Sequence, residues 1–264
     1  GSVLVPLDPE WTADDLASTA SNADAYAYFS GIDIFEKSNT VAQSISLEKV
    51  FTLEGDSGNT VSSLIESGKK RIEEGDRSYF DNEPDPDVLS LLVFTSGTTG
   101  KGKGVMLTQT AILSDLADII PYMDFARQTI ALLPPHHTYG SSVTILGQTS
   151  IGCEIYISSG IKYIQKELKE VKPGHIVLVP LYLETFYRKI LANIKDQGKE
   201  ALVFNTMKVS NALRKIGIDR RRQLFKSILA AFGGEVKMVI TGGAPVNQEI
   251  MDFFDGIGIS VLNG

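Results

Sequence analysis

The stretch at residues 91–107, LLVFTSGTTGKGKGVML, constrains the fold most, because it sets a glycine-rich loop between two apolar runs. The run from Leu91 to Phe94 has the length and composition of a buried strand, so the loop begins at the end of a rigid element. Glycines in the loop can turn backbone N–H groups inward, hydroxyl side chains add donors, and Lys101 and Lys103 add positive charge. The pattern predicts a loop that binds phosphate groups.

Two other interpretations of this loop stay open. Its composition is equally typical of a flexible surface loop with solvated lysines, although the tight bracketing by apolar runs favours a functional loop on a scaffold. The P-loop of nucleoside triphosphatases is the second, since Gly97, Gly102 and Lys103 fit the first seven positions of G-x-x-x-x-G-K-[ST]. The eighth position is Gly104, which has no hydroxyl for a metal, and a strand-like run follows where a P-loop needs a helix.

The loop resembles the signature T-S-G-T-T-G-x-P-K-G-V of the AMP-forming adenylating enzymes, the family of acyl-CoA synthetases, luciferases and adenylation domains. It departs from that signature at Gly102, where the family usually has proline. The resemblance implies that Lys101 and Lys103 hold the β- and γ-phosphates of ATP, and that Lys103 and Thr98 are catalytic. It also implies nucleotide contacts from Thr95, Ser96, Gly97, Thr99 and Gly100.

Two of the three histidines, His136 and His137, follow a strand expected at residues 129–133. Sites in open α/β folds lie at such strand ends. A turn with one exposed and one packed histidine is equally reasonable, whereas a metal site is a poor interpretation because adjacent histidines point apart. The segment LPPHHTYG resembles the family's L-P-L-F-H-x-x-G, which implies that His137 is catalytic beside the substrate carboxylate. Pro135 and His136 replace the usual Leu-Phe.

A third segment, TGGAP at residues 241–245, separates a strand expected at 236–240 from a helix expected at 246–254. The plain interpretation is a strand-to-helix turn with Pro245 at the first helical position. The segment also resembles the family's flat glycine-rich backbone that packs on adenine. This resemblance implies nucleotide contacts from Gly242, Gly243, Ala244 and Pro245.

The region between Pro134 and Cys153 has no acidic residue. Family members that activate amino acids set an aspartate just after the histidine segment, where it pairs with the substrate ammonium. An ammonium without a partner is costly to desolvate, so a plain carboxylic acid is favoured. The long helical pattern at 201–232 resembles the long-chain fatty acyl-CoA synthetases, which implies a fatty acid substrate.

Five basic residues gather within this helical pattern. A solvated helix face is the default interpretation, and a site for the phosphates of coenzyme A or for anionic lipid is the alternative. The residues are Arg214, Lys215, Arg220, Arg221 and Arg222.

Strand-like and helix-like segments alternate along the chain, which predicts the α/β class. We expect two mostly parallel-sheet subdomains flanked by helices, over residues 1–122 and 123–264. A nucleotide cleft is expected between the phosphate loop and Gly242–Ala244. The helix expected at 108–120 has apolar residues on most faces, which predicts burial on both of its sides.

The composition, with 43% hydrophobic and 22% charged residues, is that of a soluble globular protein. A net charge of -7 argues against nucleic acid as a partner. Cys153 is the only cysteine, so no intramolecular disulfide can form and a cytoplasmic location is expected. No apolar stretch is long enough to span a membrane, and peripheral membrane contact stays open. We assign no metal ligands and no oligomeric state.

The resemblance implies an ATP-dependent ligase that converts a carboxylic acid to acyl-AMP and pyrophosphate, and then to acyl-CoA. Mg²⁺ and coenzyme A are the implied cofactors. The chain stops before the family's Y-G-x-T-E segment, so we expect a piece of a longer enzyme that is inactive alone. The alternatives are an adenylating enzyme with another acceptor, such as an amino-acid or aryl-acid adenylation domain, a non-catalytic nucleotide-binding module, and a P-loop phosphotransferase.

Overall fold

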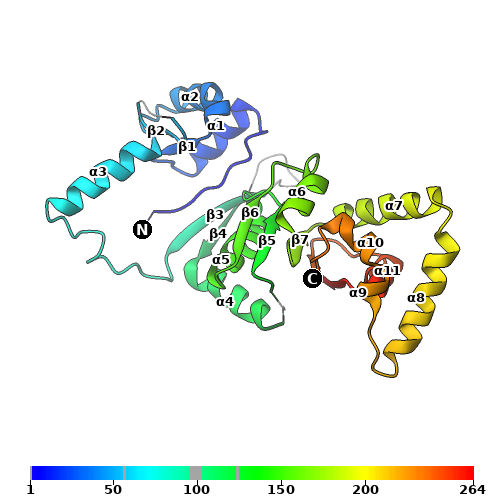
Figure 1. The fold of residues 1–264 in the computed structure, drawn as a ribbon. Helices are drawn as coiled ribbons and strands as arrows, with labels where there is room; N and C mark the ends of the chain where they lie inside the picture. The colour runs from blue at the N-terminus through cyan, green and yellow to red at the C-terminus, as the bar shows by residue number, and fades with distance from the viewer. Residues whose placement is uncertain (1, 56–57, 96–102, 123–124) are drawn as a thin grey trace. The chain divides into compact units, whose positions relative to one another are not determined.

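The computed structural model describes residues 2–55, 58–95, 103–122 and 125–264 (Figure 1). The chain divides into two compact units, Gly1–Ser114 and Asp115–Gly264, and each has apolar core residues of its own. None of the helices in these described ranges is both long and apolar enough to cross a membrane.

The first unit begins with helices beside a two-stranded parallel sheet. Tyr28 of the first strand lies opposite Val50 of the second, and Leu16, Tyr28 and Val41 form the buried core. The elements of the unit are α1 (Ala13–Asn22), β1 (Tyr28–Ser30), η1 (Ile32–Ile34), α2 (Phe35–Ser44), β2 (Val50–Thr52), α3 (Val61–Glu73), β3 (Leu89–Thr95) and β4 (Lys103–Thr108), and α4 (Gln109–Ile119) crosses into the second unit.

Side-chain caps fix the starts of two of these helices. The Thr12 hydroxyl accepts a hydrogen bond from the Asp15 backbone N–H at 3.1 Å and so caps the start of α1. At α3, the side chains of Thr60 and Ser63 each accept a hydrogen bond from the other's backbone N–H, at 3.0 and 3.1 Å. This reciprocal capping box satisfies two N–H groups that the helix itself cannot.

Strands β3 and β4 form an antiparallel pair, with Val93 opposite Val105. Only residues 96–102 connect them, and so short a connection suits an antiparallel hairpin, because a parallel pair needs a crossover of a dozen or more residues. The strands expected on both sides of the glycine-rich loop are therefore confirmed. Among the described strands of this unit, β1 and β2 are the parallel pair.

Helix α4 buries less of its surface than its composition predicts. Leu116 is its buried residue, whereas Leu113 is 57% exposed. The expectation of burial on both sides is wrong, because the helix packs on one side only. On that side Leu116 approaches Gly147 so closely that a Cβ there would lie 3.1 Å from the leucine Cδ2.

The second unit is built on a five-stranded parallel sheet in the order β6-β5-β7-β8-β9. Ile130 of β5 lies opposite Ile176 of β7, which lies opposite Val239 of β8. Every residue of β7 and β8 is buried, as expected for parallel strands covered on both faces. The α/β class is confirmed. The strands are β5 (Gln128–Ala131), β6 (Glu154–Ile157), β7 (His175–Leu178), β8 (Met238–Thr241) and β9 (Ser260–Asn263).

Helices pack against this sheet through large apolar side chains. Leu183 and Phe254 are completely buried, and the Tyr187 hydroxyl donates to the Glu249 carboxylate at 2.9 Å, which ties two helices together. The helical pattern at 201–232 is confirmed, in several pieces. The helices are η2 (Ile120–Tyr122), η3 (Gly140–Gly147), α5 (Gln148–Ser150), α6 (Ile164–Val171), α7 (Pro180–Asp196), α8 (Glu200–Arg214), α9 (Arg221–Leu224), α10 (Lys226–Leu229), η4 (Ala230–Phe232) and α11 (Gln248–Ile257).

Three of the five clustered basic residues contact other segments of the chain, whereas Arg220 donates to the nearby Gln223, at 2.9 Å. Arg214 of α8 and Arg221 of α9 both pair with Asp255 of α11, at 2.6 and 2.9 Å. Asp219 also pairs with Arg221, at 2.7 Å, and the hydrogen bond from this arginine lowers the pKa of the Asp219 carboxyl to about 2. The interpretation as a solvated helix face is wrong for Arg214 and Arg221, because one carboxylate of α11 gathers both.

Arg222 is the third of these residues, and its guanidinium binds backbone carbonyl oxygens. Its guanidinium donates to the carbonyl oxygens of Gly234, Val236 and Gly258, at 2.6, 2.7 and 3.1 Å. These carbonyls precede β8 and β9, so one side chain of α9 binds the backbone segments that lead into two neighbouring strands.

We expect Arg222→Ala to lower the free energy of unfolding by about 2 to 3 kcal/mol, because carbonyl oxygens lose charge-assisted donors that water cannot fully replace. Urea unfolding followed by circular dichroism measures the change. Arg220→Ala is the matched control, since Arg220 is exposed and should change stability by less than about 0.5 kcal/mol. Equal effects of the two substitutions would contradict a structural role for Arg222.

Candidate functional site

The expected phosphate loop is described at its two ends. Thr95 closes β3 and Lys103 opens β4, and the two residues are direct cross-strand partners with exposed side chains. The Thr95 hydroxyl donates to the Lys103 carbonyl oxygen at 3.5 Å. The other expected phosphate ligands lie outside the described residues; these are Ser96, Gly97, Thr98, Thr99, Gly100 and Lys101.

The strand after Lys103 decides between the two kinds of phosphate loop. β4 runs for six residues, and the next helix begins at Gln109. A P-loop needs a helix directly after its lysine, because the N–H groups at that helix start face the phosphates. The P-loop alternative is therefore wrong. The strand packing also explains why residue 104 is a glycine, because a Cβ there would lie 2.9 Å from the Leu92 Cδ1 across the hairpin.

The strand order of the second unit marks where a site can form. β6 lies on one side of β5, whereas β7, β8 and β9 follow on the other. The chain therefore runs from β5 to β6 in one direction along the sheet and from β7 to β8 in the opposite direction. In open parallel sheets the loops diverge at such a reversal and leave a crevice at the carboxyl ends of the strands. The segment with His136 and His137 follows β5 and therefore lies at this edge.

Backbone contacts on both sides fix the turn that carries His137. Its N–H donates to the Pro134 carbonyl oxygen at 3.1 Å, and its own carbonyl oxygen accepts from the Ser141 N–H at 2.8 Å. Gly140 comes so close to the same Pro134 oxygen that a Cβ would lie 2.1 Å from it. The His137 side chain is exposed, and its ring centroid lies 4.9 Å from that of His136.

The helical segment after this turn is anchored in the core by a buried glutamine and the third histidine. The Ala126 backbone N–H donates to His175 Nδ1 at 3.0 Å, so the ring proton is on Nε2 and is donated to Gln148 Oε1 at 2.8 Å. Gln148 and His175 are both completely buried. Neither residue belongs to a recognisable local motif, so the sequence alone does not single them out.

The His137 turn and the TGGAP segment meet within the second unit. A Cβ on Gly242 would lie 3.3 Å from Tyr139 Cζ and 3.4 Å from its hydroxyl oxygen, so only glycine lets this ring approach without a shift. Burial raises the pKa of the Tyr139 phenol to about 12. The group therefore stays neutral near neutral pH and brings no charge to this contact.

The TGGAP segment exposes backbone at the end of β8. Gly242 is buried, whereas Gly243, Ala244 and Pro245 are exposed, and Gly243 has a φ of +86°, a conformation that favours glycine. Helix α11 begins only at Gln248, because the Asn247 side chain caps it by accepting from the Glu249 N–H at 2.9 Å. The interpretation with Pro245 as the first helical residue is therefore wrong, and three small or rigid residues remain as an open surface.

Cys153 has the environment of a structural thiol. Its Sγ lies 3.2 Å from the Arg127 carbonyl oxygen and 3.3 Å from that of Ala126, and burial raises the pKa of the thiol. A raised pKa keeps the group protonated and weakly nucleophilic. Within the described residues there is also no group of three or more His, Cys, Asp or Glu side chains that could hold a metal ion.

Comparison with known proteins gives one family over the full chain. Residues 1–264 match the family described as AMP-binding enzyme. The long-chain-fatty-acid–CoA ligase 5 of Rattus norvegicus is 33% identical over 184 residues, which cover 65% of this chain and 27% of that protein. The matched part thus spans about a quarter of the relative's length.

Solved structures agree on the fold. The adenylation domain of a carboxylate reductase from Mycobacterium chelonae has a TM-score of 0.72 at 19% identity, covering 100% of this chain and 43% of that one. The didomain of a carboxylic acid reductase from Segniliparus rugosus, solved in complex with AMP, has a TM-score of 0.68 at 17% identity, covering 98% and 38%. Since the family match extends over every residue, the chain belongs to the AMP-binding enzyme family.

Proposed function

We propose that the chain is the nucleotide-binding part of a ligase that activates a long-chain fatty acid with ATP and transfers the acyl group to coenzyme A. The observation that carries this proposal is the glycine- and threonine-rich signature held between two paired strands and ending on Lys103. The name of the rat relative, a long-chain-fatty-acid–CoA ligase, supports the choice of acid and acceptor.

The proposed reaction has two steps. A carboxylate oxygen attacks the α-phosphorus of ATP, the bond to the β-phosphate oxygen breaks, and pyrophosphate leaves. The thiolate sulfur of coenzyme A then attacks the acyl carbonyl carbon, and AMP leaves with the electron pair of the broken C–O bond. Both steps build negative charge on phosphate oxygens, so positioning and charge neutralisation are the protein's main contributions.

In the first unit, the residues of the loop bind the β- and γ-phosphates in this proposal. Lys103 supplies a charge from the start of a rigid strand, and Thr95 supplies a hydroxyl from the end of its partner strand. Lys101, Thr98 and the remaining loop residues complete the set as proposed ligands. Mg²⁺ accompanies ATP in such reactions, and the described residues offer it no group of three or more His, Cys, Asp or Glu ligands.

In the second unit, the carboxyl edge of the sheet binds the organic groups in this proposal. The exposed backbone of Gly243 and Ala244, with Gly242 and Pro245 beside it, suits a flat adenine ring because no long side chain stands in the way. His137, on a turn fixed from both sides, is the proposed contact to the reacting carboxylate. Neutral Tyr139 closes the wall between these two segments.

The absence of acidic side chains around this turn supports a plain carboxylic acid. Residues 134–153 contain no Asp or Glu, so an α-ammonium group would lose water without gaining a partner from this segment. ATP–pyrophosphate exchange measured on the full-length protein with hexadecanoate, benzoate and a mixture of amino acids tests the substrate class. Exchange driven by amino acids rather than by hexadecanoate would overturn it.

We expect Lys103→Ala in the full-length protein to lower the rate of ATP–pyrophosphate exchange roughly 10- to 100-fold, because a charge-assisted phosphate contact contributes about 1.5 to 3 kcal/mol. The urea midpoint should stay unchanged, since the side chain is exposed. Lys69→Ala, at an exposed lysine of α3, is the matched control and should leave exchange unchanged. A rate within twofold of the parent for Lys103→Ala would contradict the proposed role.

We expect Gly140→Ala to lower kcat/KM for acyl-AMP formation by about 100-fold, because the added Cβ forces the His137 turn away from Pro134 and misplacement of about 1 Å is that costly. Stopped-time assays of pyrophosphate release measure the effect. Gly68→Ala is the control, since no atom lies within 4 Å of a Cβ at that helical position. An unchanged kcat/KM for Gly140→Ala would show that the turn does not position a reacting group.

A further inference from the structure

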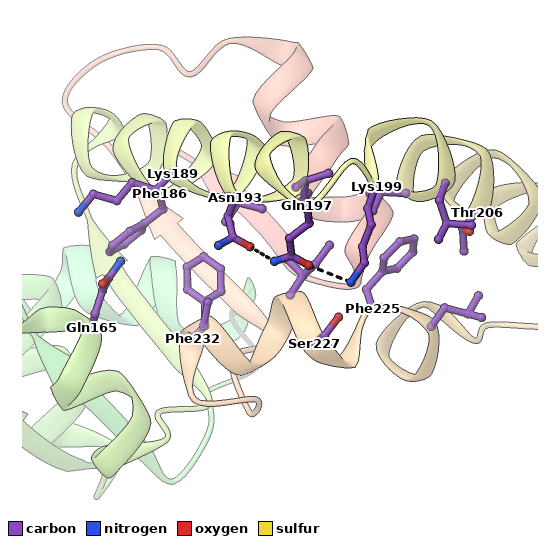
Figure 2. A pocket seen from close by; sticks show the side chains of 17 residues that line it. Gln165, Phe186, Lys189, Asn193, Gln197, Lys199, Thr206, Phe225, Ser227 and Phe232 are labelled. Atoms are coloured by element: carbon purple, nitrogen blue, oxygen red, sulfur yellow. Dashed lines mark hydrogen bonds between the residues drawn. The ribbon is translucent and has the colours of Figure 1, made fainter.

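A cavity lies in the second unit, among the helices rather than at the carboxyl edge of the sheet. It has a volume of about 600 Å³, which falls in the range of roughly 300–1,000 Å³ typical of small-molecule sites. Figure 2 shows it between α7 on one side and the segment from α9 to η4 on the other, with α6 and α8 at its ends.

The cavity is separate from the site proposed for ATP. α7 starts just after the carboxyl end of β7. The part of this helix that lines the cavity begins at Phe186, and the wall continues to Gln197 at the end of the helix. At 1.5 Å per residue these positions lie roughly 9 and 25 Å along the helix from Pro180. Phe232, on the opposite wall, precedes the amino end of β8. The cavity therefore lies toward the amino edge of the sheet.

The inner wall of the cavity is apolar. Ile190, Phe225 and Phe232 are buried in the main core of the unit and also face the cavity, and Leu202 and Ile228 extend the apolar surface. From Phe186 to Gln197 the wall along α7 is roughly 16 Å long, enough for an extended alkyl chain to lie against it. Burying such a chain would remove apolar surface from water on both partners.

A polar row crosses one wall and carries positive charge. The Lys199 ammonium donates to Gln197 Oε1 at 2.9 Å, and Gln197 Nε2 donates to Asn193 Oδ1 at 2.6 Å (Figure 2). Lys189 is a second cation in the wall, and none of the described lining residues is acidic. In a chain with a net charge of -7, this local excess of positive charge selects for an anion.

The helix ends near this row do not reverse that preference. α7 ends at Asp196 and α8 begins at Glu200, so the negative end of one helix dipole meets the positive end of the next. The two dipole fields oppose each other at this point. The carboxylates of Asp196 and Glu200 also stand at these helix ends, but neither lines the cavity, whereas Lys189 and Lys199 do. Lys199 keeps two of its three N–H donors beyond the bond to Gln197.

We propose that this cavity binds one long-chain alkyl carboxylate, with the carboxylate at Lys199 and the alkyl chain along Ile190, Phe225 and Phe232. The site is additional to the reaction proposed above and does not depend on it. Apolar walls with a cationic polar row match a ligand with one apolar tail and one negative end, whereas a cationic or uncharged head lacks the charge partner.

Titration calorimetry with the protein and dodecanoate, in the absence of ATP, tests the proposal. We expect saturable binding, and dodecyltrimethylammonium, with the same chain and the opposite charge, should not bind. Lys199→Gln should weaken dodecanoate binding roughly fivefold, as expected for an exposed charge contact. Lys195→Gln, at an exposed lysine of α7 outside the cavity, is the matched control. Equal affinities for the two head groups would overturn the proposal.

Filling the cavity gives an independent test. Ser227 is exposed on the wall, so Ser227→Trp should block the cavity and abolish binding without disturbing the core. If that variant unfolds, Ala231→Phe, at another exposed wall position, replaces it. A folded blocked variant that still binds dodecanoate with parental affinity would overturn the assignment.

Mapping separates this cavity from the acid site of the proposed reaction. A dodecanoate analogue with a photoreactive diazirine at the chain end should label peptides from residues 186–206 and 224–232. Labelling confined to residues 132–147 and 241–246 would mean that the carboxylate enters only the site beside His137, which would overturn this inference and leave the proposed function intact.

Discussion

The reversal of strand order between β5 and β7 is the constraint on which the chemistry of the second unit depends. Because the chain leaves these neighbouring strands in opposite directions, their carboxyl ends are not covered by a crossover. The first segment to use this opening is the His137 turn after β5, and the glycine-rich segment after β8 joins it. Tyr139 packed against Gly242 is the contact by which the two meet.

That arrangement requires a turn that cannot drift, and buried polar contacts supply the rigidity. The bond between Gln148 and His175 joins the helical segment after the turn to a central strand, and the Ala126 N–H fixes the histidine tautomer from its other side. Breaking such a fully buried pair would leave unpaired donors or acceptors in a dry interior, at about 1 to 3 kcal/mol for each group. The exposed His137 therefore precedes a helical segment that is tied to the central sheet by a satisfied buried pair.

Local features of this protein were predictable from the sequence, because local residues determine them. The strands around the glycine-rich loop, the Thr12 cap and the helices of the second unit follow from apolar periodicity and capping residues that lie within one element. Contacts between distant residues were not predictable in the same way. Asp255 lies 41 residues from Arg214 and 34 from Arg221, so nothing near the arginines indicated that they would pair with α11.

The same limit explains the remaining differences. The composition of α4 predicted two buried faces, but burial depends on which neighbours the fold supplies. Leu116 packs near Gly147 and is buried, whereas Leu113 is exposed. Pro245 suited a first helical position, yet Asn247 offers a side-chain acceptor, and the capped helix begins three residues later, at Gln248. For the candidate site, sequence motifs located the segments, and only the fold showed that Tyr139 and Gly242 touch.

The arginine contacts also bear on why the helical cavity stays open. Arg214 lies on α8 and Arg221 on α9, and both are tied to Asp255 of α11, so these two cavity walls share one anchor on a helix of the core. Each of these ion pairs is partly exposed and contributes little alone, but Arg222 adds three bonds to buried strand approaches beside them. If α8 and α9 collapsed onto α7, apolar surface would be removed from water, but all of these arginine contacts would have to break at once. An apolar space held open against collapse in this way is available to a ligand without reorganisation of its walls.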